Sequence, residues 1–318
     1  MTDKRMAPPF IWFGGKRRWA PEVWQRFGRP DRYLEPFAGS LAILLARPKP
    51  IKGLEIVSDL DGFICNFWRS IRADPDKVAY HADYPTIHQD LEARHRCVLK
   101  WRKKKALKLS KDPDFHDCKI AGYWAWGVSL SITGGWQQSK VYKGIPAVMP
   151  DGGGRGVSRL RGMPPGATKR DLDLVDGSRL RSWFGALSTR LSKVEVLNRD
   201  WRSFRSPTLL GDIKSSGEIL TAVFLDPPYK GYNEGMYGAT DGVDAATDSY
   251  EWAVEHGERY RIAYCCHEGD FEVPAGWESS TMTFSGIRDP ERRAETNDCV
   301  MFSPACAPKQ GFGLSGRL

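Results

Sequence analysis

The stretch Arg32–Ser40, RYLEPFAGS, decides the fold, because it reads as a short apolar strand that runs into a loop of small residues. A compact apolar segment follows from Leu41 to Ala46 and ends before Pro48, as expected for a short helix. Leu54–Val57 reads as a second strand, and apolar residues then recur at helical spacing over Phe63–Ile71. This strand–helix–strand–helix order predicts a parallel α/β sheet.

Sheet-forming segments return late in the chain, at Val194–Leu197, Thr221–Leu225 and Arg261–Cys265. The continuous apolar run Ala222–Leu225 suits a strand that is buried on both faces. Between the two groups of strands the patterns are helical: Ile87–Leu109, Ile120–Leu130 and Arg179–Leu191. We therefore expect a discontinuous α/β domain over residues 1–73 and 193–308, a helical insertion over residues 74–192 and a tail over residues 309–318.

The composition is that of a globular protein. The chain has 318 residues, of which 41% are apolar and 27% charged, which excludes disordered and collagen-like classes. No apolar run approaches the roughly 20 residues that a membrane span needs, and the first residues lead into no signal-peptide core. Seven scattered cysteines suggest a reducing compartment, so we expect a cytoplasmic protein. The net charge of +8 fits either a polyanionic partner or simple solubility.

Asp226-Pro227-Pro228-Tyr229 follows directly after the strand Ala222–Leu225. Ligands of open α/β sheets bind at the carboxyl ends of the strands, so chemistry is expected at this tetrapeptide. The prolines lack N–H donors and leave carbonyls that only accept hydrogen bonds, while Asp226 adds a carboxylate and Tyr229 a planar ring. Such a set suits an amino group on a flat heterocycle. A plain strand-to-turn junction is the alternative, because Asp-Pro-Pro is also good turn chemistry.

The loop Glu35–Ser40 lies at the end of the first predicted strand, where small residues let a nucleoside-bearing ligand approach the backbone. This loop contains neither the dinucleotide fingerprint GxGxxG nor the phosphate loop GxxxxGK(S/T). Asp59 follows the next strand, a position at which acids commonly hold ribose hydroxyls. Alternatively, Asp59 is the N-cap of the helix that begins near Asp61, and the two roles are compatible.

These residues carry a resemblance to a known family. Glu35–Ser40 and Asp226–Tyr229, in this order and separated by an insertion, resemble motifs I and IV of the Dam-like (class alpha) DNA adenine methyltransferases. Further segments are similar to other family motifs, the last two only loosely: Phe13–Lys16, Ser58–Trp68, Asn198–Asp200, Tyr123–Trp136 and Arg292–Asn297. The resemblance covers both ends of the chain well and the middle thinly.

The resemblance implies a Rossmann-like, S-adenosylmethionine-dependent methyltransferase sheet with a helical insertion domain, and S-adenosylmethionine as the cofactor. Lys16 and Gly39 would lie near the methionine end of the cofactor. Asp59 would lie at its ribose and Asp200 at its adenine. The cofactor-binding residues implied by the matched motifs are Phe13, Gly14, Lys16, Glu35, Pro36, Phe37, Gly39, Ser40, Asp59, Asp200 and Asp226.

The family's reaction is site-specific methylation of the N6 amino group of an adenine that is flipped out of double-stranded DNA. The implied catalytic residues are Asp226, Pro227, Pro228 and Tyr229. Asp226 and the Pro227 carbonyl would accept hydrogen bonds from the amino group, and Tyr229 would stack on the base. Transfer would be an in-line displacement without a metal. The cluster Cys265–His267 is too tight for a closed zinc site and is interpreted as a strand end.

The insertion carries the densest positive charge, which predicts that it binds DNA and recognises the target sequence. One basic run on a predicted helix is interrupted by Trp101 and comprises Lys100, Arg102, Lys103, Lys104 and Lys105. A solvated helix face is the alternative, but contact with phosphates is favoured beside a DNA enzyme. Three arginines on a Gly-rich loop are predicted to reach base edges, with a flexible linker as the alternative: Arg155, Arg159 and Arg161.

Leu41 departs from the family pattern, which usually has a second glycine after the Gly-Ser pair. Its side chain either narrows the methionine pocket or points into the core. Rival functions are cytosine-N4 methylation, methylation of RNA, and DNA binding by a vestigial methyltransferase fold. The family resemblance also brings a restriction-modification partner as a further option, and it implies no membrane partner.

Overall fold

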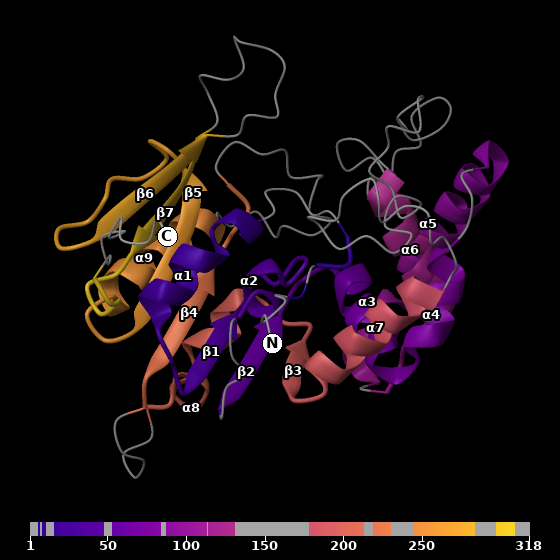
Figure 1. Ribbon diagram of the computed structural model, residues 1–318, viewed down its shortest axis with the longest axis horizontal. Coiled ribbons are helices and arrows are strands. Elements are labelled where there is room, and N and C mark those ends of the chain that lie inside the picture. Colours follow the sequence, from indigo (N-terminus) through magenta and orange to yellow (C-terminus); the bar gives the residue numbers. More distant parts are fainter. Residues whose placement is uncertain are drawn as a thin grey trace, which may run out of the picture.

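The structure is a computed structural model that describes residues 6, 8–10, 16–47, 53–83, 87–112, 114–130, 178–212, 219–229, 245–283 and 297–308. Among these residues, seven strands form one sheet in the order β3-β2-β1-β4-β5-β7-β6 (Figure 1). The strands are β1 (Arg32–Glu35), β2 (Leu54–Ser58), β3 (Val194–Leu197), β4 (Thr221–Leu225), β5 (Arg261–His267), β6 (Glu278–Thr283) and β7 (Asn297–Phe302).

The first five strands are parallel, and β7 lies antiparallel between β5 and β6. In chain order the first strand is central, with β2 on one side and β4 on the other. The prediction of a Rossmann-like α/β sheet built from both ends of the chain is therefore confirmed. The sequence did not predict the antiparallel pair, because β6 (ESSTMT) is mostly polar and β7 begins with Asn297-Asp298.

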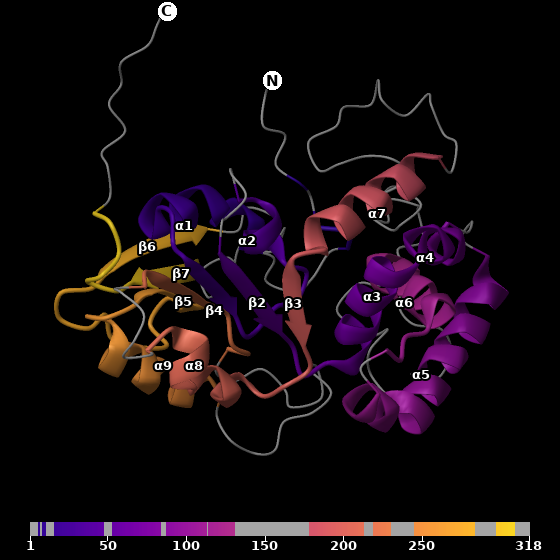
Figure 2. The same cartoon turned by 90° about the horizontal axis from the view of Figure 1, so that it is seen from below.

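Helices cover both faces of the sheet. Figure 2 shows α1 (Ala20–Phe27) and α2 (Ala42–Leu45) on one face, with α8 (Pro207–Leu210) and α9 (Ala245–His256) on the other. The remaining helices gather beyond the β3 edge: α3 (Gly62–Ala73), α4 (Pro75–Ala82), α5 (His88–Lys111), α6 (Cys118–Leu130) and α7 (Ser178–Leu191). Two short 3₁₀ helices, η1 (Lys16–Arg18) and η3 (Trp201–Arg205), border the site described below.

The core has two parts because the central strands are buried on both faces. Along β1, Tyr33 packs into one hydrophobic cluster and Leu34 into the other, as the alternation of a strand requires. The cluster on the Tyr33 side continues into the helical group, where Phe67 of α3 contacts Trp124 of α6 and Phe184 of α7. The sheet and the helical group thus share one continuous apolar core.

A buried ion pair also ties the helical group to the sheet. Arg190, near the end of α7, donates two hydrogen bonds to Glu55 of β2, at 2.6 and 2.8 Å. Arg47 donates a third to the same carboxylate, at 3.2 Å. Because Glu55 is almost fully buried, these two guanidinium groups compensate the cost of removing its charge from water. No described helix is long and apolar enough to cross a membrane.

Candidate active site

The candidate site lies at the carboxyl edge of the parallel strands, where β1 and β4 are neighbours. The chain leaves β1 toward β2 on one side, whereas β5 follows β4 on the other side. Ligands of open α/β sheets bind at such a switch point. Glu35, Asp59 and Asp226 each end a strand or follow it directly, so tertiary structure brings the predicted acids to one edge.

Lys16 and Asp226 form the centre of the site. The Lys16 Nζ lies 3.1 Å from Asp226 Oδ1 and 3.6 Å from Oδ2 of Asp298, a residue of β7. The Lys16 side chain is 3% exposed and that of Asp298 is 4% exposed, whereas the Asp226 side chain retains 21%. The ammonium is therefore enclosed between two carboxylates, and Asp226 is the carboxylate that remains accessible.

The electrostatics of this trio follow from burial and charge. Burial alone raises the pKa of the Asp226 carboxyl, and the Lys16 ammonium works against that rise. Burial lowers the pKa of Lys16, but Asp226 and Asp298 more than reverse this effect, so its pKa is raised and the amine stays protonated. Lys16 is thus a permanent cation whose presence favours the ionised form of Asp226.

Tyr229 is held between Lys16 and His267. The Lys16 Nζ is 4.9 Å from the centroid of the Tyr229 ring, which is a cation–π geometry. The edge of the ring meets His267 at the end of β5, with ring centroids 4.4 Å apart and an interplanar angle of 79°. The tyrosine is half-buried, so these contacts orient its ring before any ligand binds.

The loop after β1 is bonded to the end of β2. The Asp59 carboxylate accepts hydrogen bonds from the backbone N–H groups of Gly39 and Asp61, both at 2.9 Å. Helix α3 is capped instead by Asp61, which accepts from the Phe63 N–H at 2.8 Å, so Asp59 is not the N-cap. Burial outweighs these hydrogen bonds and raises the pKa of Asp59 to about 7. Gly39 has φ of +45°, a conformation that favours glycine.

Leu41 takes the left-handed conformation, with φ of 57° and ψ of 32°. It is the one non-glycine residue with positive φ among the described residues, which explains physically why glycine suits this position. Its side chain is completely buried in the cluster that contains Tyr33 and Trp68. Of the two alternatives for Leu41, the structure supports a side chain in the core.

Glu35 ends β1 and is 2% exposed. Its Oε2 accepts a hydrogen bond from the Tyr33 hydroxyl at 2.8 Å. Burial is the main cause that raises the pKa of Glu35 to about 8, and the negative charge of Asp226 adds to the rise. Glu35 therefore carries its proton at neutral pH and adds no full negative charge beside Asp226.

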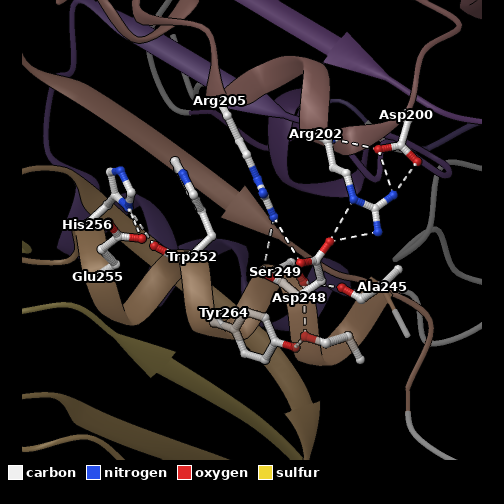
Figure 3. A network of polar contacts seen from close by, with 11 residues as sticks. Asp200, Arg202, Arg205, Ala245, Asp248, Ser249, Trp252, Glu255, His256 and Tyr264 are labelled. Carbon is white, nitrogen blue, oxygen red and sulfur yellow. Dashed lines mark hydrogen bonds and ion pairs between the residues drawn. The ribbon is translucent and has the colours of Figure 1, made fainter. Parts of the chain in front are cut away.

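Asp200 lies beyond β3 and caps η3, where its carboxylate accepts from the Arg202 N–H at 2.8 Å. The Arg202 guanidinium also bonds the same carboxylate and reaches Asp248 of α9, with Nε to Oδ2 at 2.7 Å (Figure 3). Arg205 contacts Asp248 as well. Nearby, the partly exposed Phe37 stacks on Trp201, with ring centroids 6.2 Å apart. An exposed carboxylate and an aromatic face thus border this end of the site.

The basic run lies on α5. Trp101 is buried against Phe63 and Phe115, with ring centroids 5.6 and 6.3 Å away. The helix consequently turns its lysines outward, and three described lysines of the basic run are exposed: Lys100, Lys104 and Lys105. Arg102 is half-buried, with its guanidinium 5.4 Å from the Phe63 ring.

Some predicted site residues lie outside the described residues: Phe13, Gly14, Arg155, Arg159, Arg161 and the side chain of Lys103. Conversely, the structure reveals two site neighbours that sequence reasoning missed, Asp298 and His267. A signal for His267 existed, because it lies just beyond the predicted strand Arg261–Cys265, as Asp226 follows the strand Thr221–Leu225. Asp298 had no such signal, since its strand was not predicted.

Comparisons with known proteins found one matching family and similar solved structures. Residues 12–98 match the family described as D12 class N6 adenine-specific DNA methyltransferase. A solved structure, the rRNA methyltransferase aviRa from Streptomyces viridochromogenes, is similar over 94% of this chain and 88% of that chain, with 14% identity and a TM-score of 0.33. The comparison with curated proteins gave no match. The matched residues 12–98 contain Lys16, the loop Glu35–Ser40 and Asp59, so this part of the chain is similar to the D12 class of N6 adenine-specific DNA methyltransferases.

Proposed function

We propose that this protein is a DNA adenine methyltransferase that takes its methyl group from S-adenosylmethionine and transfers it to an adenine that is flipped out of double-stranded DNA and held by Asp226. The observation that carries the proposal is the buried Lys16–Asp226 pair, 3.1 Å apart, beside an accessible edge of the Asp226 carboxylate. The Lys16 ammonium favours the ionised form of this acceptor at the carboxyl end of β4, where the amino group of a base would meet it.

The residues at the ends of β1, β2 and β3 fit S-adenosylmethionine. At Gly39 no side chain stands between the backbone of the loop and a ligand. Asp59 offers carboxylate oxygens to ribose hydroxyls, and Phe37 offers a half-exposed aromatic face to a purine. When bound, the cofactor supplies an electrophilic methyl group on a sulfonium.

The Asp226-Pro227-Pro228-Tyr229 segment would then hold the base. Asp226 and the Pro227 carbonyl accept hydrogen bonds from the amino group, which favours a nitrogen lone pair directed out of the ring plane. Tyr229, whose ring Lys16 and His267 already orient, stacks on the base. Rate enhancement then comes from positioning and from electrostatics, with no covalent intermediate on the protein.

Nucleoside analysis tests the proposed reaction. Duplex DNA incubated with the protein and methyl-labelled S-adenosylmethionine is digested to nucleosides and separated, and the label is expected in N6-methyladenine. Label in N4-methylcytosine would contradict the adenine assignment. Calorimetry with S-adenosylmethionine alone tests the cofactor, and absence of binding would favour a vestigial fold that only binds DNA.

We expect cofactor affinity to depend on pH through Asp59. Because its pKa is about 7 in the folded protein, the carboxylate loses its charge as pH falls from 8 to 6. A protonated carboxyl accepts weaker hydrogen bonds from ribose hydroxyls, so the Kd for S-adenosylmethionine should rise about tenfold over this interval. Calorimetry at several pH values measures the change.

The matched variant is Asp59→Asn, which has nearly the same shape but no charge. It should bind weakly at both pH values and show a flat pH profile. A wild-type Kd that is constant from pH 6 to 8 would contradict the role of Asp59 at the ribose.

We further propose that the segment of residues 74–192, whose described parts are mainly helical, recognises DNA and that α5 contacts phosphates. Reversal of charge at the exposed Lys104 and Lys105, as Lys104→Glu/Lys105→Glu, should weaken binding to specific and non-specific duplexes alike. The slope of log K against log salt should become flatter by up to about two. Fluorescence anisotropy at several salt concentrations measures both effects.

A control with the same change of charge is Arg29→Glu/Lys193→Glu. Both residues are exposed and precede β1 and β3, at the edge of the sheet opposite the site. The control should leave the salt slope nearly unchanged. Equal effects of the two double variants would mean that net charge, and not α5, determines binding.

A further inference from the structure

Asp298 is a buried acid that has no role in the reaction proposed above. It lies on β7, directly opposite His267 of the antiparallel neighbour β5, and is 3% exposed. This placement brings it beside the segment that follows β4, although the two are far apart in the sequence. Burial of an ionised carboxylate costs free energy unless a nearby cation compensates its charge. The contacts of Asp298 therefore show which cation compensates it.

The compensating cation is Lys16. Oδ2 of Asp298 lies 3.6 Å from the Lys16 Nζ, and within the described residues this oxygen has no hydrogen-bond partner. The same ammonium lies 3.1 Å from Asp226 Oδ1. Lys16 is consequently held from two sides, and only one of its two carboxylate partners is accessible to a base.

The second anchor limits where the ammonium can lie. A lysine side chain has four rotatable bonds, so a single ion pair with Asp226 would leave Nζ a choice of positions. A second buried carboxylate on the far strand narrows that choice. It also keeps Nζ over the ring of Tyr229, at 4.9 Å.

We propose that Asp298 is a positioning residue for methyl transfer: it anchors the Lys16 ammonium against Asp226 and makes no contact with the substrate. The inference rests on the proposed role of Asp226 as acceptor for the adenine amino group. It predicts that Asp298 acts only when Lys16 is present, and that its own negative charge opposes ionisation of Asp226.

Several titratable groups face Asp226, and their effects have opposite signs. Lys16 favours its ionised form, whereas the negative charge of Asp298 disfavours it. Glu35 on β1 and Cys265 on β5 also interact electrostatically with Asp226. Tyr229 lies on the same segment, and its ring packs against His267 of β5.

A double-mutant cycle tests the proposal with the full-length protein. The variants are Asp298→Asn, Lys16→Met and the two combined, and the readout is the single-turnover rate of methyl transfer to duplex DNA at pH 7.5. Asp298→Asn should lower this rate about tenfold, because the ammonium is less well positioned. In the Lys16→Met background the same change should cause no loss, or should raise the rate, since it removes an uncompensated charge beside Asp226. Losses that multiply in the double variant, or an unchanged rate in Asp298→Asn, would overturn the proposal.

A pH titration measures a quantity, the pKa of Asp226, that a purely structural role of Asp298 would leave unchanged. In Asp298→Asn the acid limb of the rate profile should shift to lower pH, because Asp226 loses a repelling neighbour, whereas Lys16→Met should shift it to higher pH. NMR of protein with ¹³C-labelled aspartate follows the Asp226 carboxyl without any catalysis, and the same downward shift is expected. A pKa of Asp226 that does not move in Asp298→Asn would overturn the proposal.

The same NMR titration separates this inference from the proposed function. If Asp298→Asn lowers the pKa of Asp226 but the wild-type protein transfers no methyl group to adenine, the role of Asp226 fails while the charge coupling stands. Thermal unfolding identifies variants that have lost the fold. If Asp298→Asn unfolds at the assay temperature, the variant Asp298→Glu replaces it in the test, because it keeps the negative charge. Asp298→Glu should restore both the fold and the rate of methyl transfer. A variant that folds but does not recover the rate would overturn the proposal.

Discussion

Replacement of Asp226 by alanine is expected to lower methyl transfer by about 10³-fold or more while the Kd for S-adenosylmethionine changes by less than about threefold. The change removes the carboxylate that would accept the adenine amino group at the end of β4. The fold should tolerate it, because Lys16 keeps Asp298 as a buried counter-charge. Single-turnover methylation of duplex DNA and calorimetry with the cofactor measure the two quantities.

Two control variants make the Asp226 result specific. Asp226→Asn keeps the shape of the side chain but replaces one acceptor oxygen by a donor, so it should also lose most of the activity. Asp76→Ala removes an exposed carboxylate from α4 and should leave the rate unchanged. Methylation that persists in Asp226→Ala would exclude Asp226 as the acceptor.

Replacement of Lys16 by methionine is the second change with a large expected effect, a loss of about 100-fold at pH 7.5. Burial already raises the pKa of Asp226, and Lys16 holds it down. Without the ammonium, the pKa of Asp226 rises further, and the carboxyl group stays protonated up to a higher pH. Since only the ionised form accepts hydrogen bonds from the amino group on both oxygens, the acid limb of kcat/KM should move to higher pH.

The pH profile distinguishes this role of Lys16 from a contact with the cofactor. If Lys16 acts by keeping Asp226 ionised, the Lys16→Met variant should recover part of its rate at pH 9. Lys16→Arg keeps the positive charge, so the acid limb of its pH–rate profile should lie at lower pH than that of Lys16→Met. A loss that is equal at every pH, together with a raised Kd for S-adenosylmethionine, would instead place Lys16 at the cofactor. Stability should fall as well, because two buried carboxylates then lack their cation, and thermal unfolding measures this cost.

Much of the fold was readable from the sequence because its signals are local. The alternation from Arg32 to Ile71 and the apolar run of β4 depend only on neighbours along the chain, and the structure contains these elements close to the predicted bounds. The boundaries of elements, such as the end of the short helix before Pro48, are also determined by residues close by in the sequence. The site motifs were readable for a related reason, since Asp59 and Asp226 directly follow strands that the sequence predicts.

The antiparallel strands were not readable, because their stability comes from partners elsewhere in the chain. The hydrogen bonds of β7 go to β5 and β6, and its first residues, Asn297 and Asp298, carry no apolar signal. The sequence also could not decide whether the Leu41 side chain narrows the methionine pocket or points into the core, because it does not reveal that this residue takes the left-handed conformation. Only the packed loop between β1 and α2 turns its side chain into the core.

The sequence by itself determined the order of the predicted elements, the loop Glu35–Ser40 and the acids Asp59 and Asp226 that follow predicted strands, because local spacing and residue type encode them. Tertiary structure alone decided that Lys16 lies between Asp226 and Asp298. That meeting depends on Lys16 of η1 reaching the segment after β4 and on β7 pairing beside β5, neither of which any short stretch of the chain specifies. The physical reason is that a buried charge is compensated by whichever residue the long-range packing brings near it, wherever that residue lies in the chain.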